Sequence, residues 1–300
     1  MQEIFYSLEH KAGFVNIVGS PNVGKSTLMN RLVGENLSII TSKAQTTRHR
    51  IMGMVNGDDF QIVYSDTPGV LDPKYKLQEG MMKFVYNALQ DADVLIVVTD
   101  IFEDNMNHET LIEKIREMDV PVFVLVNKID LGTQEQFESR LEHWSKMLPK
   151  AKVAPISALH SFNTERILEA IIEKLPENPP YFPKDELTNK PMRFFVSEII
   201  REKILLHYKQ EIPYSCEVIV EEYKDTEMLV RIRAVIVVAR DSQKGILIGH
   251  QGKMMKRVGT DARKDIQSFV GKKVFIELFV KVDKNWRDDE KKLKRYGYLD

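Results

Sequence analysis

A glycine-rich segment near the N-terminus has the residue types and spacing of a phosphate-binding loop. Gly19-Ser-Pro-Asn-Val-Gly-Lys-Ser26 fits the pattern GxxxxGK[ST], whose glycines let backbone N–H groups close around phosphates. Lys25 carries the charge to reach the β- and γ-phosphates, and the Ser26 hydroxyl suits Mg²⁺. The apolar run 14–18 predicts a buried strand before the loop, and 27–33 predicts a helix after it. We therefore predict a nucleoside triphosphate site.

A second motif, one hundred residues later, predicts which base is bound. Asn127-Lys-Ile-Asp130 follows the apolar run 122–126 and would lie at the carboxyl end of a buried strand. The Asp130 carboxylate can accept both N1–H and the exocyclic amine of guanine, and adenine lacks this donor pair. Each buried polar group left unpaired costs about 1–3 kcal/mol, so GTP should bind about 10²–10⁴-fold more tightly than ATP. Lys128 should lie along one ring face, and Asn127 should brace the phosphate loop.

The sequence Asp66-Thr-Pro-Gly69 ends a strand predicted over residues 60–66. In this place Asp66 would support Mg²⁺ from its second coordination shell, and the Gly69 N–H would contact the γ-phosphate. The next residue is Val70, where signalling GTPases carry a glutamine that orients the attacking water. Valine cannot orient water, so unaided hydrolysis should be slow.

A polar stretch, Lys43-Ala-Gln-Thr-Thr-Arg-His49, lies between the first helix and the next strand. A threonine in this stretch can complete Mg²⁺ coordination only while the γ-phosphate is present, which would make the stretch a switch. We favour Thr47 over Thr46 because Thr47 directly precedes an arginine. A plain loop containing two threonines is the alternative.

The final nucleotide motif is Ser157-Ala158, which follows a strand predicted over 153–156 and would offer its backbone to guanine O6. The candidate nucleotide contacts are Gly19, Ser20, Pro21, Asn22, Val23, Gly24, Lys25, Ser26, Thr27, Asp66, Thr67, Pro68, Gly69, Asn127, Lys128, Asp130, Ser157 and Ala158. Within this set, the candidate metal-site residues are Ser26, Thr47 and Asp66. The candidates for catalysis are Lys25, Thr47, Gly69 and Asn22.

Composition predicts a protein of two domains. The chain has 300 residues, 43% of them hydrophobic, and one cysteine, which excludes an internal disulfide framework. No apolar run approaches the ~18–20 residues that a membrane span needs, and the N-terminus has no signal-peptide core. We expect a soluble cytoplasmic protein.

The two halves of the chain differ in charge. Residues 191–300 contain 23 Lys and Arg against 17 Asp and Glu, a net charge of +6, and residues 1–190 carry −7. A basic half suggests a polyanionic partner. Between the halves, Leu175–Pro191 contains five prolines and should form a semi-rigid linker. We predict a first domain over 1–178, a linker over 179–191 and a second domain over 192–300.

The pattern of the second domain predicts the order α-β-β-α-α-β. Helical periodicity covers 193–208, strands are expected over 215–223, 228–239 and 273–282, and helices over 243–248 and 253–270. Gly249-His-Gln-Gly252, between the last two helices, matches the GxxG loop that clamps a nucleic-acid backbone. The candidate RNA contacts are Lys244, Ile248, Gly249, His250, Gln251, Gly252, Lys253, Lys256 and Arg257. The alternative is a solvated basic helix whose methionines lie in the core.

Together these motifs resemble the Era family of bacterial GTPases, which carry a C-terminal KH domain of the type II order. The resemblance covers nearly the whole chain, through 19–27, 43–50, 66–69, 127–130, 156–158 and 246–263. It implies a P-loop GTPase domain of the α/β class, with a mostly parallel sheet and helices on both faces, followed by an α+β KH domain. It also implies GTP and GDP as ligands, Mg²⁺ as cofactor, and binding near the 3′ end of 16S ribosomal RNA during maturation of the small ribosomal subunit.

The resemblance implies two further properties. One is loose association with the cytoplasmic face of the inner membrane, although no residue here indicates a lipid anchor. The other concerns K⁺, which in related GTPases supplies positive charge near the β/γ bridge when the loop reads Gly-x-Pro-Asn. Asn22 occupies that place, and the alternative is that Asn22 only shapes the loop.

Two other classes of protein remain as alternatives. A GTPase coupled to another RNA process, such as tRNA modification, would need a further catalytic cluster, and the lone Cys216 argues against paired cysteines. A membrane-associated regulatory GTPase would need an amphipathic or lipidated terminus, which neither end of the chain supplies.

Overall fold

The computed structural model describes residues 10–103, 106 and 108–299, and these form two compact units. The N-terminal segment 1–9, where we expect no signal-peptide core, lies outside the described residues. Unit 1 contains the described parts of Met1–Ser38, Thr47–Pro73 and Met81–Asn189. Unit 2 contains Ile39–Thr46, Lys74–Gly80 and the described part of Lys190–Asp300. Unit 2 thus includes two short segments from the first half of the sequence.

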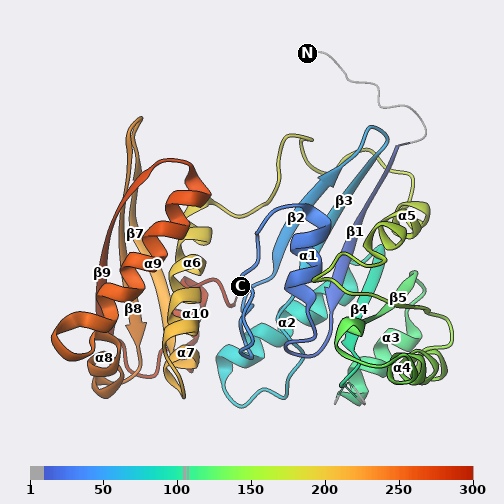
Figure 1. Cartoon of the computed structure of the whole chain (residues 1–300), viewed down its shortest axis with the longest axis horizontal. Coiled ribbons are helices and arrows are strands. Elements are labelled where there is room, and N and C mark those ends of the chain that lie inside the picture. The colour runs from blue at the N-terminus through green and yellow to red at the C-terminus, as the bar shows by residue number, and fades with distance from the viewer. Residues whose placement is uncertain (1–9, 104–105, 107, 300) are drawn as a thin grey trace. The chain divides into compact units, whose positions relative to one another are not determined.

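Unit 1 is built on a six-stranded sheet in the order β2-β3-β1-β4-β5-β6 (Figure 1). Only β2 pairs antiparallel, with β3, and the other pairs are parallel. Every residue of β4 and β5 is buried, as expected for apolar strands with helices on both faces. The strands are β1 (Lys11–Val18), β2 (Ile51–Asn56), β3 (Phe60–Asp66), β4 (Val94–Asp100), β5 (Val122–Asn127) and β6 (Lys152–Pro155).

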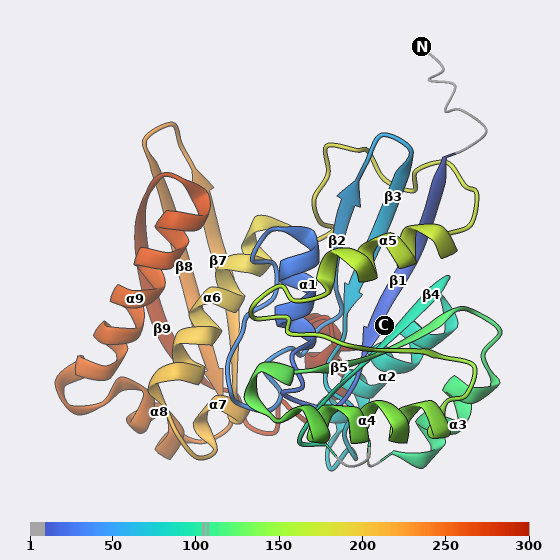
Figure 2. The same cartoon turned by 45° about the vertical axis from the view of Figure 1, so that its right-hand side comes forward.

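Helices cover both faces of this sheet. Helices α2, α3 and α4 pack on one face through an apolar cluster that includes Val85, Ile115 and Trp144, and α1 and α5 lie on the other (Figure 2). The structure therefore confirms the predicted α/β class. The helices are α1 (Lys25–Val33), α2 (Lys76–Gln90), α3 (Glu109–Glu117), α4 (Gln134–Met147) and α5 (Thr164–Lys174), with a 3₁₀ turn η1 (Ile129–Leu131). Helix α2 belongs to unit 1 from Met81 onward.

The proline-rich segment after α5 is held against unit 1. The Gln61 carboxamide on β3 accepts hydrogen bonds from the backbone N–H groups of Tyr181 (2.7 Å) and Phe182 (3.0 Å). Its amide nitrogen donates to the Phe182 carbonyl at 2.8 Å, and Thr188 forms an isolated bridge with Gly53. These bonds fix the path of a segment whose prolines cannot join the sheet ladder.

The main part of unit 2 is a three-stranded sheet, β7-β8-β9, with α6 and α9 side by side on one face (Figure 1). The predicted α-β-β-α-α-β order is confirmed, with two short helices in addition, α7 (Ile212–Ser215) and α10 (Glu290–Arg295). The strands are β7 (Cys216–Asp225), β8 (Leu229–Val238) and β9 (Lys273–Val282). The helices are α6 (Met192–His207), α8 (Asp241–Ile248) and α9 (Lys253–Val270), with a 3₁₀ turn η2 (His250–Gly252).

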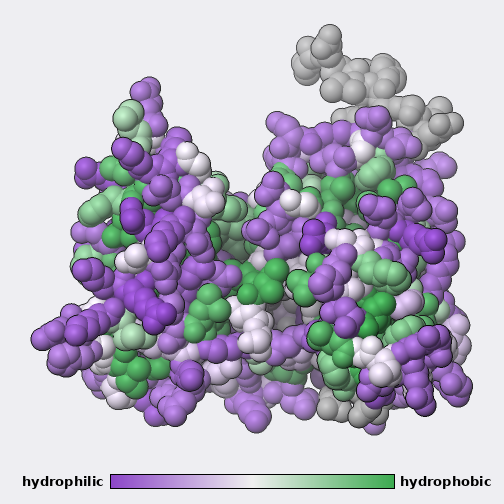
Figure 3. All heavy atoms as spheres, viewed as in Figure 1, coloured by the Kyte–Doolittle hydropathy of each residue, from purple (hydrophilic) through white to green (hydrophobic). Residues whose placement is uncertain are grey.

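Hydrophilic side chains predominate on the face seen in Figure 3, with smaller groups of hydrophobic residues between them. Among the described residues, no helix combines the length and the apolar composition needed to cross a membrane.

Candidate functional site

The phosphate loop depends on two glycines. Gly19 and Gly24 have φ values of +152° and +100°, which residues with a Cβ rarely adopt. A Cβ on Gly19 would lie 2.1 Å from the Val98 carbonyl oxygen, and one on Gly24 would lie 2.2 Å from Asn127 Nδ2. Gly24 also directly precedes α1, so the helix N-terminus opens onto the loop. The loop is therefore shaped by the strands that follow it in sequence.

Lys25 lies inside this loop with its charge directed at backbone oxygens. Its Nζ donates to the carbonyls of Gly19 (2.9 Å) and Ser20 (2.7 Å). Burial lowers the pKa of Lys25 to about 8, although the carboxylates of Asp66 and Glu103 act in the opposite direction. A phosphate entering the loop would supply the negative charge that the buried ammonium lacks.

Affinity for GTP is expected to fall as the pH rises from 7.5 to 9. The ligand-free protein loses the Lys25 proton near pH 8, and phosphate binding favours the protonated amine, so binding above pH 8 must take up a proton. The loss should approach about tenfold per pH unit. Calorimetric titration in two buffers of different ionisation enthalpy measures this uptake. Lys25→Arg, which stays charged, should abolish it, and binding without proton uptake by the unchanged protein would contradict the assignment.

Three predicted metal-site residues converge beside the loop. The Ser26 hydroxyl donates to Asp66 Oδ2 at 2.7 Å and lies 2.9 Å from Thr47 Oγ1, which itself lies 3.3 Å from the same carboxylate oxygen. Burial raises the pKa of Asp66, and its hydrogen bonds and Lys25 oppose this rise. Among the described residues, buried Asp66 Oδ1 accepts no hydrogen bond. Two hydroxyls and an unsatisfied carboxylate oxygen suit a hard divalent cation such as Mg²⁺.

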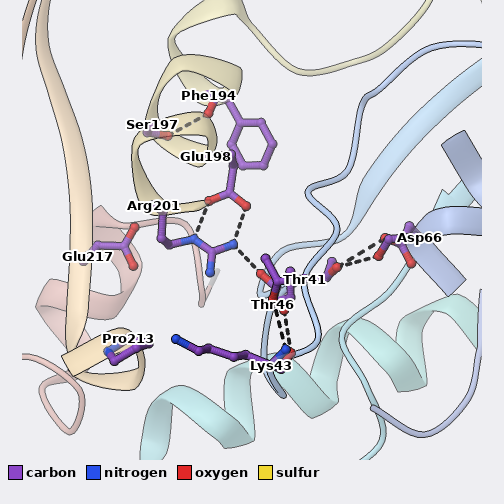
Figure 4. Close-up of polar contacts among 12 residues, drawn as sticks. Thr41, Lys43, Thr46, Asp66, Phe194, Ser197, Glu198, Arg201, Pro213 and Glu217 are labelled. Carbon is purple, nitrogen blue, oxygen red and sulfur yellow. Dashed lines mark hydrogen bonds and ion pairs between the residues drawn. The ribbon is translucent and has the colours of Figure 1, made fainter. Parts of the chain in front are cut away.

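The two candidate switch threonines have different surroundings. Thr47 Oγ1 faces Ser26 and Asp66, whereas Thr46 Oγ1 donates to the Lys43 carbonyl (2.6 Å) and lies 2.7 Å from Thr41 Oγ1. Figure 4 shows Thr46 beside Thr41 and Lys43 of its own loop. The geometry therefore supports Thr47 as the metal ligand, and the choice between the two remains a prediction.

The predicted guanine-binding residues lie together at the carboxyl ends of β5 and β6. Asn127 Nδ2 donates to the Val23 carbonyl at 2.8 Å, and its Oδ1 accepts from Ala158 N–H at 2.9 Å. Asn127 is the last residue of β5, so the bond to Val23 braces the phosphate loop to that strand, as predicted. The bond from Ala158 additionally joins it to the segment after β6. Asp130 Oδ1 accepts from the Ser157 hydroxyl at 2.6 Å, which fixes the carboxylate that would read guanine.

Lys128 has a partner that the sequence motifs did not indicate. Its ammonium donates to the Asn22 carbonyl at 2.7 Å and forms an ion pair with Asp100 Oδ2 at 2.6 Å. Asp100 is the last residue of β4 and is only 6% exposed. The ion pair directs the lysine stem, because it fixes the charged end of the side chain beside the loop. The signal in the sequence was an acidic residue at the end of a buried strand.

A second acidic residue near the loop was also missed. Glu103 accepts a hydrogen bond from Thr99 Oγ1 at 2.8 Å and another from the Ser20 side chain. Burial raises the pKa of Glu103, against the effect of these bonds and of Lys25. Glu103 therefore ties the second residue of the phosphate loop to β4.

The remaining predicted nucleotide contacts line the loop or the turn after β3. The Thr67 hydroxyl donates to the Ile17 carbonyl at 2.8 Å, and Val70 N–H donates to the Gly19 carbonyl at 3.1 Å. A Cβ on Gly69 would lie 2.8 Å from Pro21 Cα, so only glycine allows this approach. Thr27 is half-buried in the first turn of α1, and Pro68 is buried in the turn after β3.

In unit 2, the GxxG loop has the backbone freedom and the exposure that clamping a phosphate requires. Gly249 and Gly252 have φ values of +69° and +73°. A Cβ on Gly249 would lie 2.8 Å from Met254 Cγ, whereas one on Gly252 would meet nothing within 4 Å. His250 and Gln251 are exposed, and Gly252 directly precedes the 18-residue helix α9. The open side of the loop is therefore free for a backbone phosphate.

The other predicted RNA contacts surround this loop. Lys253, Lys256 and Arg257 are exposed on the first turns of α9, and Lys244 and Ile248 are half-buried on α8. Met254 and Met255 pack partly against the core of unit 2, which is the alternative position we considered for the methionines. The structure brings the cations and the glycine loop to one end of the unit.

Segment Ile39–Thr46 belongs to unit 2 through contacts with α6 (Figure 4). Arg201 is 1% exposed and donates to the Thr46 carbonyl, while its Nε donates to Glu198 Oε1 at 2.7 Å. Lys43 Nζ donates to the carbonyls of Leu205 and Tyr208 at the C-terminal end of α6. These cations satisfy carbonyls that a helix end and a loop would otherwise leave to water.

The fold and the site define a P-loop GTPase joined to a KH domain. Residues 14–128 match the 50S ribosome-binding GTPase family, and residues 211–287 match the KH domain. The chain is 42% identical to GTPase Era of Staphylococcus haemolyticus (strain JCSC1435) over 294 residues, 97% of this chain and 98% of that protein. The chain belongs to the Era family of GTPases.

Two solved structures share this arrangement of elements. A variant of Aquifex aeolicus Era bound to GDP and AlF₄⁻ matches with a TM-score of 0.92 and 36% identity, over 96% of this chain and 99% of that chain. Era in complex with MgGDPNP and nucleotides 1506–1542 of 16S ribosomal RNA also matches with a TM-score of 0.92 and 36% identity. That match covers 97% of this chain and 99% of the other.

Proposed function

We propose that this GTPase binds small-subunit ribosomal RNA near its 3′ end and assists maturation of the 30S subunit in the cytoplasm. The observation that carries the proposal is the 36% identity, over nearly the full length of both chains, to Era bound to nucleotides 1506–1542 of 16S ribosomal RNA. The exposed GxxG loop and its surrounding cations support the same reading. We retain 1–178, 179–191 and 192–300 as the proposed domain boundaries.

We propose that Mg²⁺ is the resident cofactor, held by Ser26 and Thr47 with Asp66 behind them. Bound there, the ion would neutralise charge on the β- and γ-phosphates. Lys25 adds a second positive charge at the same phosphates. The Gly69 N–H would contact the γ-phosphate, so its turn would respond to the presence of that phosphate. Asp130 and Lys128 orient the base, which fixes the nucleotide at its other end. These residues position GTP, and none of them is a general base.

We also propose that segment Ile39–Thr46 lets unit 2 respond to the nucleotide. Thr46 is held by Arg201, and the next residue, Thr47, carries the candidate Mg²⁺ ligand. Loss of the γ-phosphate would release Thr47 and thereby change the segment that Lys43 and Arg201 hold on α6. The coupling free energy between two binding sites is reciprocal. RNA bound to unit 2 would therefore change the affinity for the nucleotide in turn.

Affinity for an RNA of nucleotides 1506–1542 is expected to differ about 5- to 150-fold between the protein loaded with GDPNP and with GDP. Lys43→Met, which removes the bonds to the Leu205 and Tyr208 carbonyls, should reduce this ratio several-fold. Lys74→Met, an exposed change in the other short segment of unit 2, is the matched control. Fluorescence titration measures both affinities. If the protein binds no RNA in both the GDPNP and the GDP state, the proposed function is refuted. If it binds RNA with equal affinity in the two states, only the coupling is refuted.

We further propose that the protein associates only loosely with the inner membrane. A separate proposal is that K⁺ supports hydrolysis through Asn22. Replacing Na⁺ by K⁺ at equal ionic strength should raise the GTPase rate about tenfold or more, because a fixed cation would offset charge developing at the β/γ bridge. Asn22→Ala should abolish the rise. Since Asn22 has φ +65°, Asn22→Gly serves as the unstrained second variant. A rate that is indifferent to the cation would leave Asn22 as a loop-shaping residue.

A further inference from the structure

The β7-β8-β9 sheet has one face covered by helices and another that is partly open. Ile232, Ala234 and Ile236 of β8 point into the apolar cluster under α6 and α9. The alternating residues of β8 therefore point to the opposite face. Parallel register places Arg231 beside Phe275, Arg233 beside Glu277 and Val235 beside Phe279 on that face.

The C-terminal segment covers only one end of this second face. Val235 and Val237 are 8% and 1% exposed, and the Tyr298 hydroxyl donates to Glu217 Oε2 at 2.6 Å on the strand beside Val237. Trp286 is fully buried, and its Nε1 donates to the Ser215 carbonyl at 3.3 Å. Among the described residues, the rest of this face remains exposed.

We call the remaining area the open sheet patch. It consists of Arg231, Arg233, Lys273, Phe275, Glu277, Phe279 and Lys281, all exposed. Phe275 and Phe279 are 50% and 43% exposed, and the Arg233 guanidinium lies over the Phe279 ring at 4.6 Å from its centroid. The patch therefore exposes two aromatic rings to water, one of them with an arginine stacked on it.

The charges of the patch indicate the kind of partner. The patch holds four cations and one carboxylate, and the neighbouring β7 adds Lys224, Glu221 and Glu222. Glu222 pairs with Lys224 at 2.9 Å, and Glu221 lies 3.9 Å from Arg233. The remaining excess is positive. A second copy placed by two-fold symmetry would bring arginines against arginines, which disfavours self-association.

We propose that the open sheet patch is a second RNA-binding surface, which stacks unpaired bases on Phe275 and Phe279 and binds phosphates through Arg231 and Arg233. Sheet surfaces that carry exposed aromatic residues stack bases without sequence preference, and adjacent arginines add charge. The patch lies on the face opposite α9 and so is separate from the GxxG loop that precedes that helix. The inference rests on the proposed function, because it assigns further RNA contact to the same domain.

The test uses full-length protein and RNA probes of two lengths. The long probe is nucleotides 1506–1542 of 16S ribosomal RNA. The short probes are consecutive pieces of this RNA, each about ten nucleotides long. Such a piece is long enough to occupy a GxxG loop, which clamps four nucleotides. Among the short probes, we choose one that the unchanged protein binds and the His250→Asp/Gln251→Asp variant does not, because such a probe binds at the GxxG loop. Phe275→Thr/Phe279→Thr keeps β-propensity while removing both rings, and Arg231→Gln/Arg233→Gln removes the charge.

Both patch variants are expected to weaken binding of the long probe about 10- to 100-fold and to leave binding of the chosen short probe unchanged. Ultraviolet crosslinking should join the long probe to the peptide that contains β9. Leu206→Gln, which removes an exposed apolar residue from α6, is the matched control and should change neither affinity.

Full affinity for the long probe in both folded patch variants would overturn the inference. A change of oligomeric state in these variants, measured by sedimentation, would assign the face to a protein partner and would overturn it as well. Failure of the unchanged protein to bind either probe would instead refute the proposed function.

Discussion

Asp130→Asn is expected to change the preferred nucleotide from GTP to XTP. The amide that replaces the carboxylate places a donor where guanine carries its exocyclic amine and xanthine carries an oxygen. Since each mispaired buried group costs about 1–3 kcal/mol, GTP affinity should fall about 10²- to 10⁴-fold, and XTP affinity should rise. Titration with both nucleotides measures the exchange.

Ser157→Ala provides the graded control for this prediction. It removes only the hydroxyl that donates to Asp130 Oδ1 at 2.6 Å. The affinity for GTP should therefore fall, and the affinity for XTP should not rise. A folded Asp130→Asn protein that still prefers GTP would show that another residue reads the base.

The double substitution His250→Asp/Gln251→Asp is expected to abolish specific RNA binding while leaving GTP affinity unchanged. Both side chains are exposed, and the change places two negative charges where the loop and the N-terminus of α9 would receive a phosphate. The free energy of unfolding should change by less than about 0.5 kcal/mol, because substitutions in exposed loops rarely change it more. The salt dependence of any residual binding should flatten as phosphate contacts are lost.

Titration at several salt concentrations, beside a thermal melt, measures these effects. The matched control is His250→Asn/Gln251→Asn, which changes the same positions without adding charge. Asparagine also tolerates the left-handed conformation of Gln251, whose φ is +52°. If the aspartate variant keeps full RNA affinity and a normal melting temperature, the GxxG loop does not clamp RNA.

The sequence by itself determined the nucleotide motifs and the strands that end at them. Gly19, Gly24 and Lys25 are fixed by their spacing, because a phosphate loop needs glycine freedom and one cation within a few residues. The apolar runs of β4 and β5 predict buried strands for a similarly local reason, since a continuous run of apolar residues has no solvent-facing side. The order of elements in unit 2 followed from periodicity in the same way.

Only the tertiary structure decided which residues meet across long separations. Asp100 pairs with Lys128, Glu103 reaches Ser20, and Arg201 holds the Thr46 carbonyl 155 residues away. No local pattern marks such pairs, because each partner alone is an ordinary charged residue and the distance between them depends on chain folding. The same holds for the exposure of Phe275 and Phe279. Strand alternation places them on one face, but only the path of the C-terminal segment leaves that face open.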